Sequence, residues 1–224
     1  MKVITESQFK AHQGFDLTSW DDKDQPEEAQ PRHYRVLKAS LVKDLVEKVA
    51  TDIRVDPSNV RLWIMVNRQN KTVRPDQPLT IPEMSMALNS LFEKIQSSNT
   101  RTLGIEDASN KHNNKSSDFR LWAEVATEAK PGKNLEPWAQ ARDSNSAWIV
   151  VFLKRYDPES QTLRGVGHLY MKKNDKVAEL TPAILAEMNW PPGTPLKLYE
   201  VLPPLLHAVN YNANGSAGNK TTND

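Results

Sequence analysis

The chain has 224 residues, which is enough for one large domain or two domains of about 100 residues each. Its 29 basic and 28 acidic residues nearly cancel, which argues against a nucleic-acid binder and against attraction to an anionic membrane. Cysteine is absent, which excludes disulfides, cysteine-ligated zinc and a cysteine nucleophile. The longest apolar run is far too short to span a bilayer, and the start lacks a signal-peptide pattern. We therefore expect an intracellular protein of the nucleus or the cytoplasm.

The amino-terminal part is predicted to form two strands separated by an acidic loop. The strands are expected over residues 3–9 and 33–38. The acidic residues between them could bind a basic peptide, although such a charge run is more often only a solvated loop. These candidate partner-binding residues are Asp21, Asp22, Asp24, Glu27 and Glu28.

A helix is predicted over residues 41–53, because apolar residues repeat there at spacings of three and four. Ser40 is placed to cap this helix, since its hydroxyl can accept a hydrogen bond from an amide of the first turn. Asp56-Pro57 then turns the chain into a strand over 60–66. The order so far is strand, strand, helix, strand.

The next stretch has no counterpart later in the chain. Thr80 and Glu83 have the spacing of a capping box, and an apolar helical stripe follows from Met84 to Ile95. This stripe could offer a groove to a partner, but packing against the protein's own sheet is the more common use. Residues 97–117 are polar and are predicted to be a mobile loop, and 119–125 look like a closing strand.

Residues 130–146 read as a linker, because proline and glycine punctuate them. The following run, Trp148 to Leu153, is apolar at every position. Such a run suits a strand that is covered on both faces, in the middle of a sheet. A hairpin partner strand is predicted over 163–171.

A second helix follows the hairpin, and Pro182 lies within its apolar pattern. Proline deep in a helix costs roughly 3 kcal/mol, so we favour a start at Thr181, with Pro182 in the first turn. A third strand is expected over 196–199, and residues 208–224 are predicted to be a disordered tail.

The two helices repeat one pattern at a constant offset. The first copy has Val42, Leu45, Val49 and Ile53, and the second has Val177, Leu180, Ile184 and Met188. In each copy a proline ends the helix and an apolar run follows. The repetition predicts two tandem copies of one small α+β domain.

A hairpin, a helix and a third strand follow one another as in ubiquitin, so each copy resembles the β-grasp fold. Several segments resemble, more specifically, the first two ubiquitin-like domains of the HAUSP-type (herpesvirus-associated) ubiquitin-specific proteases. The segments are Phe9–Gly14, Tyr34–Lys38 and Val60–Met65 for the first domain, and Phe152–Pro158, Gly167–Tyr170 and Lys176–Pro182 for the second. The resemblance runs from about Val3 to Pro204, and the stretch from Thr80 to Ser117 looks more like the fungal relatives than the animal ones.

The resemblance implies α+β tandem ubiquitin-like β-grasp domains, the second apparently truncated. The implied boundaries are a first domain over 1–129 with a helical and disordered insertion at 80–117, a linker over 130–146, a partial second domain over 147–207 and a tail over 208–224. Because the second copy has no candidate for its last strand, the strand from Trp148 to Leu153 is expected to have an unpaired edge and an uncovered face.

In that family these domains are not catalytic, and they recruit substrates or regulators, typically through Lys/Arg-rich segments of the partner. The resemblance therefore implies a protein-interaction module of a deubiquitinase, with proteins as partners. The acidic run that the family uses lies near the end of the second domain, where this chain has Asn-rich residues, so no partner-binding residue is carried across. The alternative is a truncated gene fragment with no activity of its own, a deubiquitinase only by family.

Rival functions find little support in the residues. An active hydrolase is excluded for this chain because a cysteine protease needs its cysteine. The five histidines are scattered along the chain. His168 lies in a predicted strand, where a histidine is more often a packed or surface residue than a catalytic one. No metal, cofactor or small-molecule site is expected. Of the tryptophans, only Trp20 and Trp138 remain as candidate interface anchors, since Trp190 matches a core position and Trp122 lies in a predicted strand.

Overall fold

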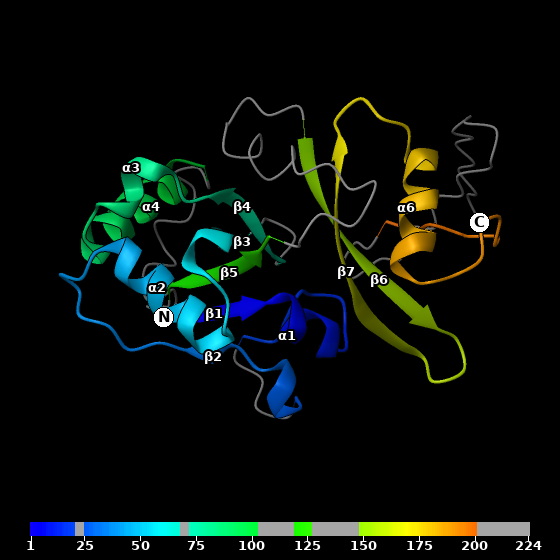
Figure 1. The fold of residues 1–224 in the computed structure, drawn as a ribbon, viewed down its shortest axis with the longest axis horizontal. Coiled ribbons are helices and arrows are strands. Elements are labelled where there is room, and N and C mark those ends of the chain that lie inside the picture. Colours follow the sequence, from blue (N-terminus) through cyan, green and yellow to red (C-terminus); the bar gives the residue numbers. More distant parts are fainter. Residues whose placement is uncertain (21–24, 68–71, 103–118, 127–147, 201–224) are drawn as a thin grey trace, which may run out of the picture.

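A computed structural model describes residues 1–20, 25–67, 72–102, 119–126 and 148–200 (Figure 1). We refer to the described residues up to 126 as the first unit and to 148–200 as the second unit. The first unit contains β1 (Lys2–Thr5), α1 (Glu6–Ala11), the 3₁₀ turn η1 (Glu27–Ala29), β2 (Arg32–His33), α2 (Val42–Ile53), the 3₁₀ turn η2 (Pro57–Asn59), β3 (Val60–Asn67), β4 (Val73–Pro78), α3 (Ile81–Met84), α4 (Leu88–Thr102) and β5 (Arg120–Val125). The second unit contains β6 (Trp148–Asp157), β7 (Thr162–Lys172), the 3₁₀ turn η4 (Val177–Glu179) and α6 (Leu180–Glu187).

The first unit is built on a five-stranded mixed sheet in the order β2-β1-β5-β3-β4. The central strands β1 and β5 run parallel, with Val3 opposite Leu121, and the other pairs are antiparallel. The first and last strands thus lie side by side in the middle of the sheet, which is the β-grasp order. The α+β class and the β-grasp type of the first unit are as expected from the sequence.

Successive side chains of the sheet point to opposite faces, because a strand has a period of two. One face carries Val3, Leu62, Ile64 and Leu121, and it packs with α2 and α4 into the main core. In Figure 1 these two helices lie together on one side of the sheet, away from the second unit. The predicted stripe of α4 is therefore used for core packing, and Leu91 is fully buried.

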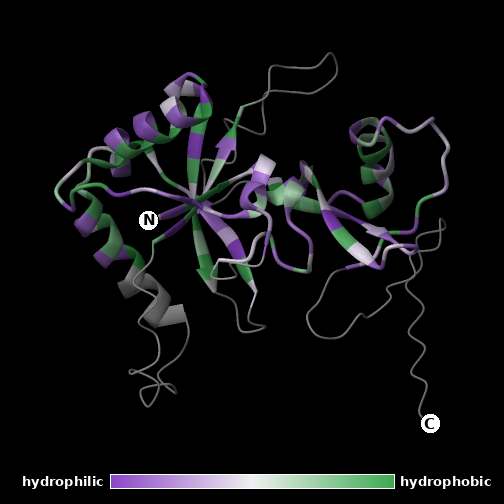
Figure 2. Cartoon of the chain, turned by 90° about the horizontal axis from the view of Figure 1, so that it is seen from below, coloured by the Kyte–Doolittle hydropathy of each residue, from purple (hydrophilic) through white to green (hydrophobic). Residues whose placement is uncertain are grey.

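The other face of this sheet is aromatic and is covered by the second unit. We call the cluster of Phe9, Trp63 and Trp122 the aromatic face; Ile4 and Met65 extend it. Val150, Phe152 and Tyr170 of the β6–β7 hairpin pack against it. Figure 2 shows the hairpin and α6 on the side of the sheet opposite α2 and α4.

The expectation that the apolar strand beginning at Trp148 lies in the middle of a sheet is wrong for the described residues, because β6 pairs there only with β7. Both faces of the strand nevertheless pack against neighbours and are partly buried, although Ile149 is exposed, so the expectation of an uncovered face is also wrong. Even-numbered residues such as Phe152 meet the aromatic face of the first unit, and odd-numbered residues such as Val151 and Leu153 pack towards α6. The uniform apolar pattern therefore reflects two different neighbours.

The start of the chain differs from the prediction of a strand over 3–9. The strand β1 ends at Thr5, and α1 begins at Glu6. The Thr5 amide donates to the Gln8 side chain at 2.9 Å, which fixes the first turn of the helix. The second strand is also shorter than predicted, since β2 covers only Arg32–His33.

The boundaries of the middle helices need three corrections. The residue that caps α2 is Leu41, not Ser40, and its amide donates to the Asp44 carboxylate at 2.9 Å. The predicted helix after Thr80 is two helices, α3 and α4, with a break between Met84 and Leu88. The helix α4 continues to Thr102, so residues 97–102 are helical and not part of a loop.

The strand β4 was not predicted from the sequence, and it contains Pro75 and Pro78. It lies at the edge of the sheet, where proline is tolerated since one side of the strand needs no amide donors. The capping box at the start of α3 is confirmed: the Thr80 amide donates to Glu83 Oε2 at 2.7 Å.

In the second unit the later helix start is confirmed, with α6 beginning at Leu180 and Pro182 in its first turn. The strand expected over 196–199 is wrong, because this segment is irregular, although Leu196 and Leu198 pack against the cluster of Leu180 and Ile184. The repeated positions of the two helices face a core in both units. The predicted linker 130–146 and tail 208–224 lie outside the described residues.

Candidate functional site

A cluster of ionisable side chains lies between the aromatic face and the hairpin, and we call it the ion cluster. It consists of Glu6, Arg61, Glu124, His168 and Tyr170. The first three come from α1, β3 and β5 of the first unit, and the last two come from β7 of the second. Arg61 and Glu124 are opposite each other in the β3–β5 pairing, so the sheet register itself brings them together.

Glu124 is the centre of the ion cluster. Its Oε2 accepts hydrogen bonds from Arg61 Nε at 2.9 Å and from Trp63 Nε1 at 2.5 Å, and its Oε1 accepts one from the Tyr170 hydroxyl. The side chains of Arg61 and Glu124 are only 3% and 2% exposed. Burial alone would raise the pKa of Glu124, but His168, Arg61 and Tyr170 hold this pKa below its ordinary value. A buried carboxylate this well paired stays ionised.

His168 connects the two units through two carboxylates. Its Nδ1 lies 2.7 Å from Glu6 Oε2, and its Nε2 lies 3.4 Å from Glu124 Oε1. Burial would lower the pKa of His168, but the hydrogen bonds and charges of Glu124 and Glu6 raise it to about 9. The ring packs edge-on against Trp122, with 4.9 Å between centroids. At neutral pH His168 is therefore a partly buried cation between two anions.

This charge state decides what the ion cluster can do chemically. A protonated imidazole has no lone pair with which to accept a proton, so His168 cannot act as a general base at neutral pH. Glu6 is equally unsuited, because burial would raise its pKa but hydrogen bonds from His168 and Lys10 lower it to about 2. The arrangement fits an ion pair that fixes the geometry of two units and does not fit an acid–base pair.

Other contacts hold the hairpin close to the segment that follows α1. Lys154 Nζ donates to the carbonyl oxygens of Gly14 and Asp16, each at 2.5 Å. Burial, together with the charge of Arg74, lowers the pKa of Lys154 to about 8. A backbone bridge pairs Gln13 with Arg164.

Gly165 lies where the hairpin and the first unit are closest. A β-carbon added at Gly165 would lie 2.2 Å from the carbonyl oxygen of Phe9, so only glycine fits there without a shift of backbone. The bulge in the β6–β7 pairing next to Gly165 helps the hairpin to follow this surface.

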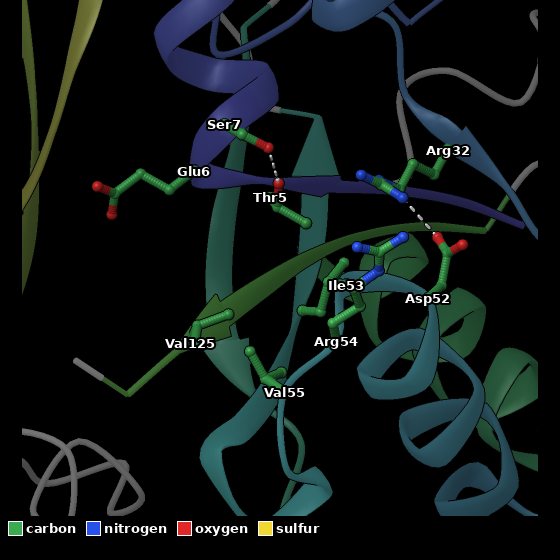
Figure 3. A pocket seen from close by; sticks show the side chains of 9 residues that line it. All are labelled: Thr5, Glu6, Ser7, Arg32, Asp52, Ile53, Arg54, Val55 and Val125. Carbon is green, nitrogen blue, oxygen red and sulfur yellow. Dashed lines mark hydrogen bonds and ion pairs between the residues drawn. The ribbon is translucent and has the colours of Figure 1, made fainter. Parts of the chain in front are cut away.

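An open depression of about 500 Å³ lies at the end of α2, beside the start of α1 (Figure 3). Arg32 and Arg54 face each other across it, and Arg32 donates to Asp52 at 2.6 Å. Asp52 also accepts a hydrogen bond from the Tyr34 hydroxyl at 2.6 Å, outside the group drawn in Figure 3. Within the depression Arg32 pairs with Asp52 and Thr5 with Ser7, and the other lining residues are mostly apolar, so we assign no ligand to it.

The predicted acidic residues are only partly within the described chain. Asp21, Asp22 and Asp24 lie outside the described residues. Glu27 and Glu28 lie on η1, are exposed, and line a second open depression together with Gln30 and Arg32. These two carboxylates are therefore accessible to a partner.

The tryptophans are distributed differently from the prediction. Trp20 is only 7% exposed and packs with the aromatic face, so it is not an interface anchor for an outside partner. Trp138 lies outside the described residues. Trp190 is half-buried, with the Arg155 guanidinium 5.7 Å from its ring centroid.

The ion cluster was not predicted from the sequence, because its carboxylates and His168 are far apart in the chain. Within the described ranges, no group of three or more residues of the metal-binding types converges on a point. In the same ranges, no helix has the length and apolar character needed to cross a membrane.

Comparison with known proteins identifies the family. The family model described as the ICP0-binding domain of ubiquitin-specific protease 7 matches residues 60–213. The chain is 27% identical over 200 residues to ubiquitin carboxyl-terminal hydrolase 15 of Schizosaccharomyces pombe, which covers 89% of this chain and 16% of that protein. It is 31% identical over 170 residues to ubiquitin C-terminal hydrolase 13 of Arabidopsis thaliana, which covers 75% of this chain and 13% of that protein.

The chain thus spans only 13% to 16% of the length of these two relatives. The family match covers more than half of the chain, and it includes β3, β5 and the whole second unit. The resemblance proposed from the short segments is therefore confirmed, and the chain belongs to the ubiquitin-specific protease family, in the region that matches the ICP0-binding domain of ubiquitin-specific protease 7.

Proposed function

We propose that the chain is a non-catalytic protein-interaction module of a deubiquitinase, which recruits substrates or regulators to a ubiquitin-specific cysteine protease domain. The observation that carries this proposal is the match of residues 60–213 to a domain whose name describes binding of a protein, ICP0. The ligands of this chain are therefore proposed to be proteins.

The chemistry of the chain supports a role in binding more than one in catalysis. The sequence has no cysteine, and a cysteine-type deubiquitinase needs one as its nucleophile. The ion cluster holds His168 as a cation, with a pKa of about 9. Hydrolysis of ubiquitin conjugates is therefore expected to occur in a domain that this chain does not contain.

We propose Glu27 and Glu28 as part of the contact with Lys/Arg-rich segments of a partner. Both carboxylates are exposed and line one depression, so a cationic side chain could approach them without displacing packed residues. Asp21, Asp22 and Asp24 are close to them in the sequence and would add to the same negative charge.

The test is fluorescence anisotropy of a labelled Lys/Arg-rich peptide titrated with the full chain. The variant is Glu27→Lys with Glu28→Lys, and the matched control is Glu159→Lys with Glu179→Lys, two exposed residues of the second unit. We expect the first double variant to weaken binding by roughly tenfold and the control by less than about twofold. Equal binding by both variants would remove the acidic residues from the proposal. Turnover of a ubiquitin–fluorophore substrate by the full chain would contradict the non-catalytic role.

A further inference from the structure

We propose that the second unit is a releasable cover for the aromatic face of the first unit, and that His168 is the positioning residue that holds the cover in place. This inference is independent of the acidic residues on η1 and of the identity of any partner. It concerns a contact within the chain that would control access to Phe9, Trp63 and Trp122.

Each unit has a core of its own, which makes separation of the two physically reasonable. The main core of the first unit is built from α2, α4 and the opposite face of the sheet, with no residue of the hairpin. The cluster around Leu180 and Ile184 belongs entirely to the second unit. Of the three apolar clusters only the aromatic face is shared, so moving the hairpin away removes no residue from either of the other two.

The contact between the units adds directional polar pairs to its apolar packing. His168 carries a positive charge into a space bordered by Glu6 and Glu124, at 2.7 and 3.4 Å. The Tyr170 hydroxyl adds a hydrogen bond to Glu124, and Lys10 lies 3.6 Å from Glu187 of α6. Lys10 and Arg61 pair with Glu6 and Glu124 within the first unit, whereas both pairs of His168 cross between the units. Loss of the His168 charge therefore removes both of these cross-unit ion pairs at once.

The surface beneath the hairpin has the composition of a binding site. Three aromatic rings lie beside two carboxylates, and the hairpin fills this surface with Phe152, His168 and Tyr170. A segment that offers a cation next to aromatic side chains would make the same contacts. The hairpin therefore acts as an internal ligand, and a protein partner with a cationic-aromatic segment would have to displace it.

Two variants disturb the contact in unrelated ways. His168→Gln removes the charge, and Gly165→Ala places a methyl group 2.2 Å from the Phe9 carbonyl oxygen without changing any charge. The control for the first is His33→Gln, an exposed histidine of β2. The control for the second is Ala178→Ser, an uncharged change at an exposed position of the second unit.

The measurement is amide hydrogen exchange of the full chain, followed by mass spectrometry, with Nile red fluorescence as a neutral probe of exposed apolar surface. We expect both variants to speed exchange in α1 and β7 by roughly a hundredfold while α2 keeps its protection. His168→Gln removes the ion pairs between the units, and Gly165→Ala forces the hairpin backbone away from Phe9. Nile red fluorescence should rise in both variants and in neither control.

Two outcomes would overturn the inference. If exchange in α1 and β7 is unchanged in both variants, the ion cluster and Gly165 do not hold the units together. If α2 loses protection together with β7, the hairpin is an inseparable part of one cooperative core and not a cover.

Discussion

The two units begin with similar elements but reach stability by different routes. The first unit completes a five-stranded sheet and buries Val42, Leu45 and Val49 of its helix completely. The second unit, within its described residues, has a two-stranded sheet, and its helix residues Leu180 and Ile184 keep 8% and 7% of their surface exposed. An isolated hairpin with one short helix is marginal in water.

This comparison shows where the second unit buries the rest of its apolar surface. One face of the hairpin packs on its own helix, and the other packs on the aromatic face of its neighbour. The first unit thus folds around a core of its own and also presents the aromatic face. The second unit depends on that face for part of its buried surface. Variants that act on one unit or on the contact between them should therefore have distinguishable effects.

The largest effect is expected from Glu124→Ala, which removes the centre of the ion cluster. Arg61, Trp63 and Tyr170 would all lose an acceptor in a buried site, and we expect a loss of roughly 3–5 kcal/mol in the free energy of unfolding. Urea denaturation followed by tryptophan fluorescence measures this loss.

The control for this variant is Glu47→Ala on the exposed side of α2, with an expected change within about 0.5 kcal/mol. The pair Arg61→Met with Glu124→Leu should be more stable than Glu124→Ala alone, because it removes both buried charges together. A loss below about 1 kcal/mol for Glu124→Ala would mean that water reaches Arg61 and replaces the carboxylate.

A smaller difference in stability is expected between variants of the two cores. Leu45→Ala leaves a cavity in the fully buried core of the first unit, and we expect a cost of roughly 3–5 kcal/mol. Leu180→Ala should cost only about 2 kcal/mol, because its smaller cluster lies near the surface and can collapse around the gap. Thermal unfolding of both variants tests whether Leu45→Ala costs more stability than Leu180→Ala. The control is Leu37→Ala, at a position that is 78% exposed. Equal costs would show that the second core is as tightly packed as the first.

The sequence was sufficient for the parts of the fold that follow local rules. The helix α2, the strand β3, the hairpin and the start of α6 were predicted because their apolar spacing matches their structure. The strand β4 was missed because its prolines are acceptable only at a sheet edge, and the position of a strand in a sheet is not written in its own residues.

The ion cluster could not be predicted for a related reason. Its members become neighbours through the β3–β5 register and through docking of the hairpin, both of which are long-range events. A single clue was present: Arg61 and Glu124 are charged residues inside apolar strands, and a charge there needs a partner. The identity of that partner could come only from the structure, and so could the burial of Trp20.

The smallest net effect is the dependence of stability on pH. It tests the contact between the units through the charges of His168 and Lys154. The pKa of His168 rises from 6.5 to about 9 in the folded chain, so its stabilising contribution is complete below pH 6.5 and is lost as the pH rises through 9. The contribution is on the order of 3 kcal/mol at most. Lys154 acts in the opposite sense: burial lowers its pKa from 10.5 to about 8, so the folded state gains stability as the pH rises through that interval.

Because of the charged groups that face His168, the main loss of stability is expected at alkaline pH. These are Glu6 and Lys10 of α1, Arg61 of β3, Glu124 of β5 and Glu187 of α6. The pKa of Glu6 falls to about 2, so its contribution is present above pH 4.5 and is lost only in strong acid. Melting temperatures should therefore peak between about pH 4.5 and 6.5 and decline towards pH 9. His168→Gln should flatten that decline and His33→Gln should not; an unchanged slope in His168→Gln would assign the decline to another group and would leave His168 neutral in the folded protein.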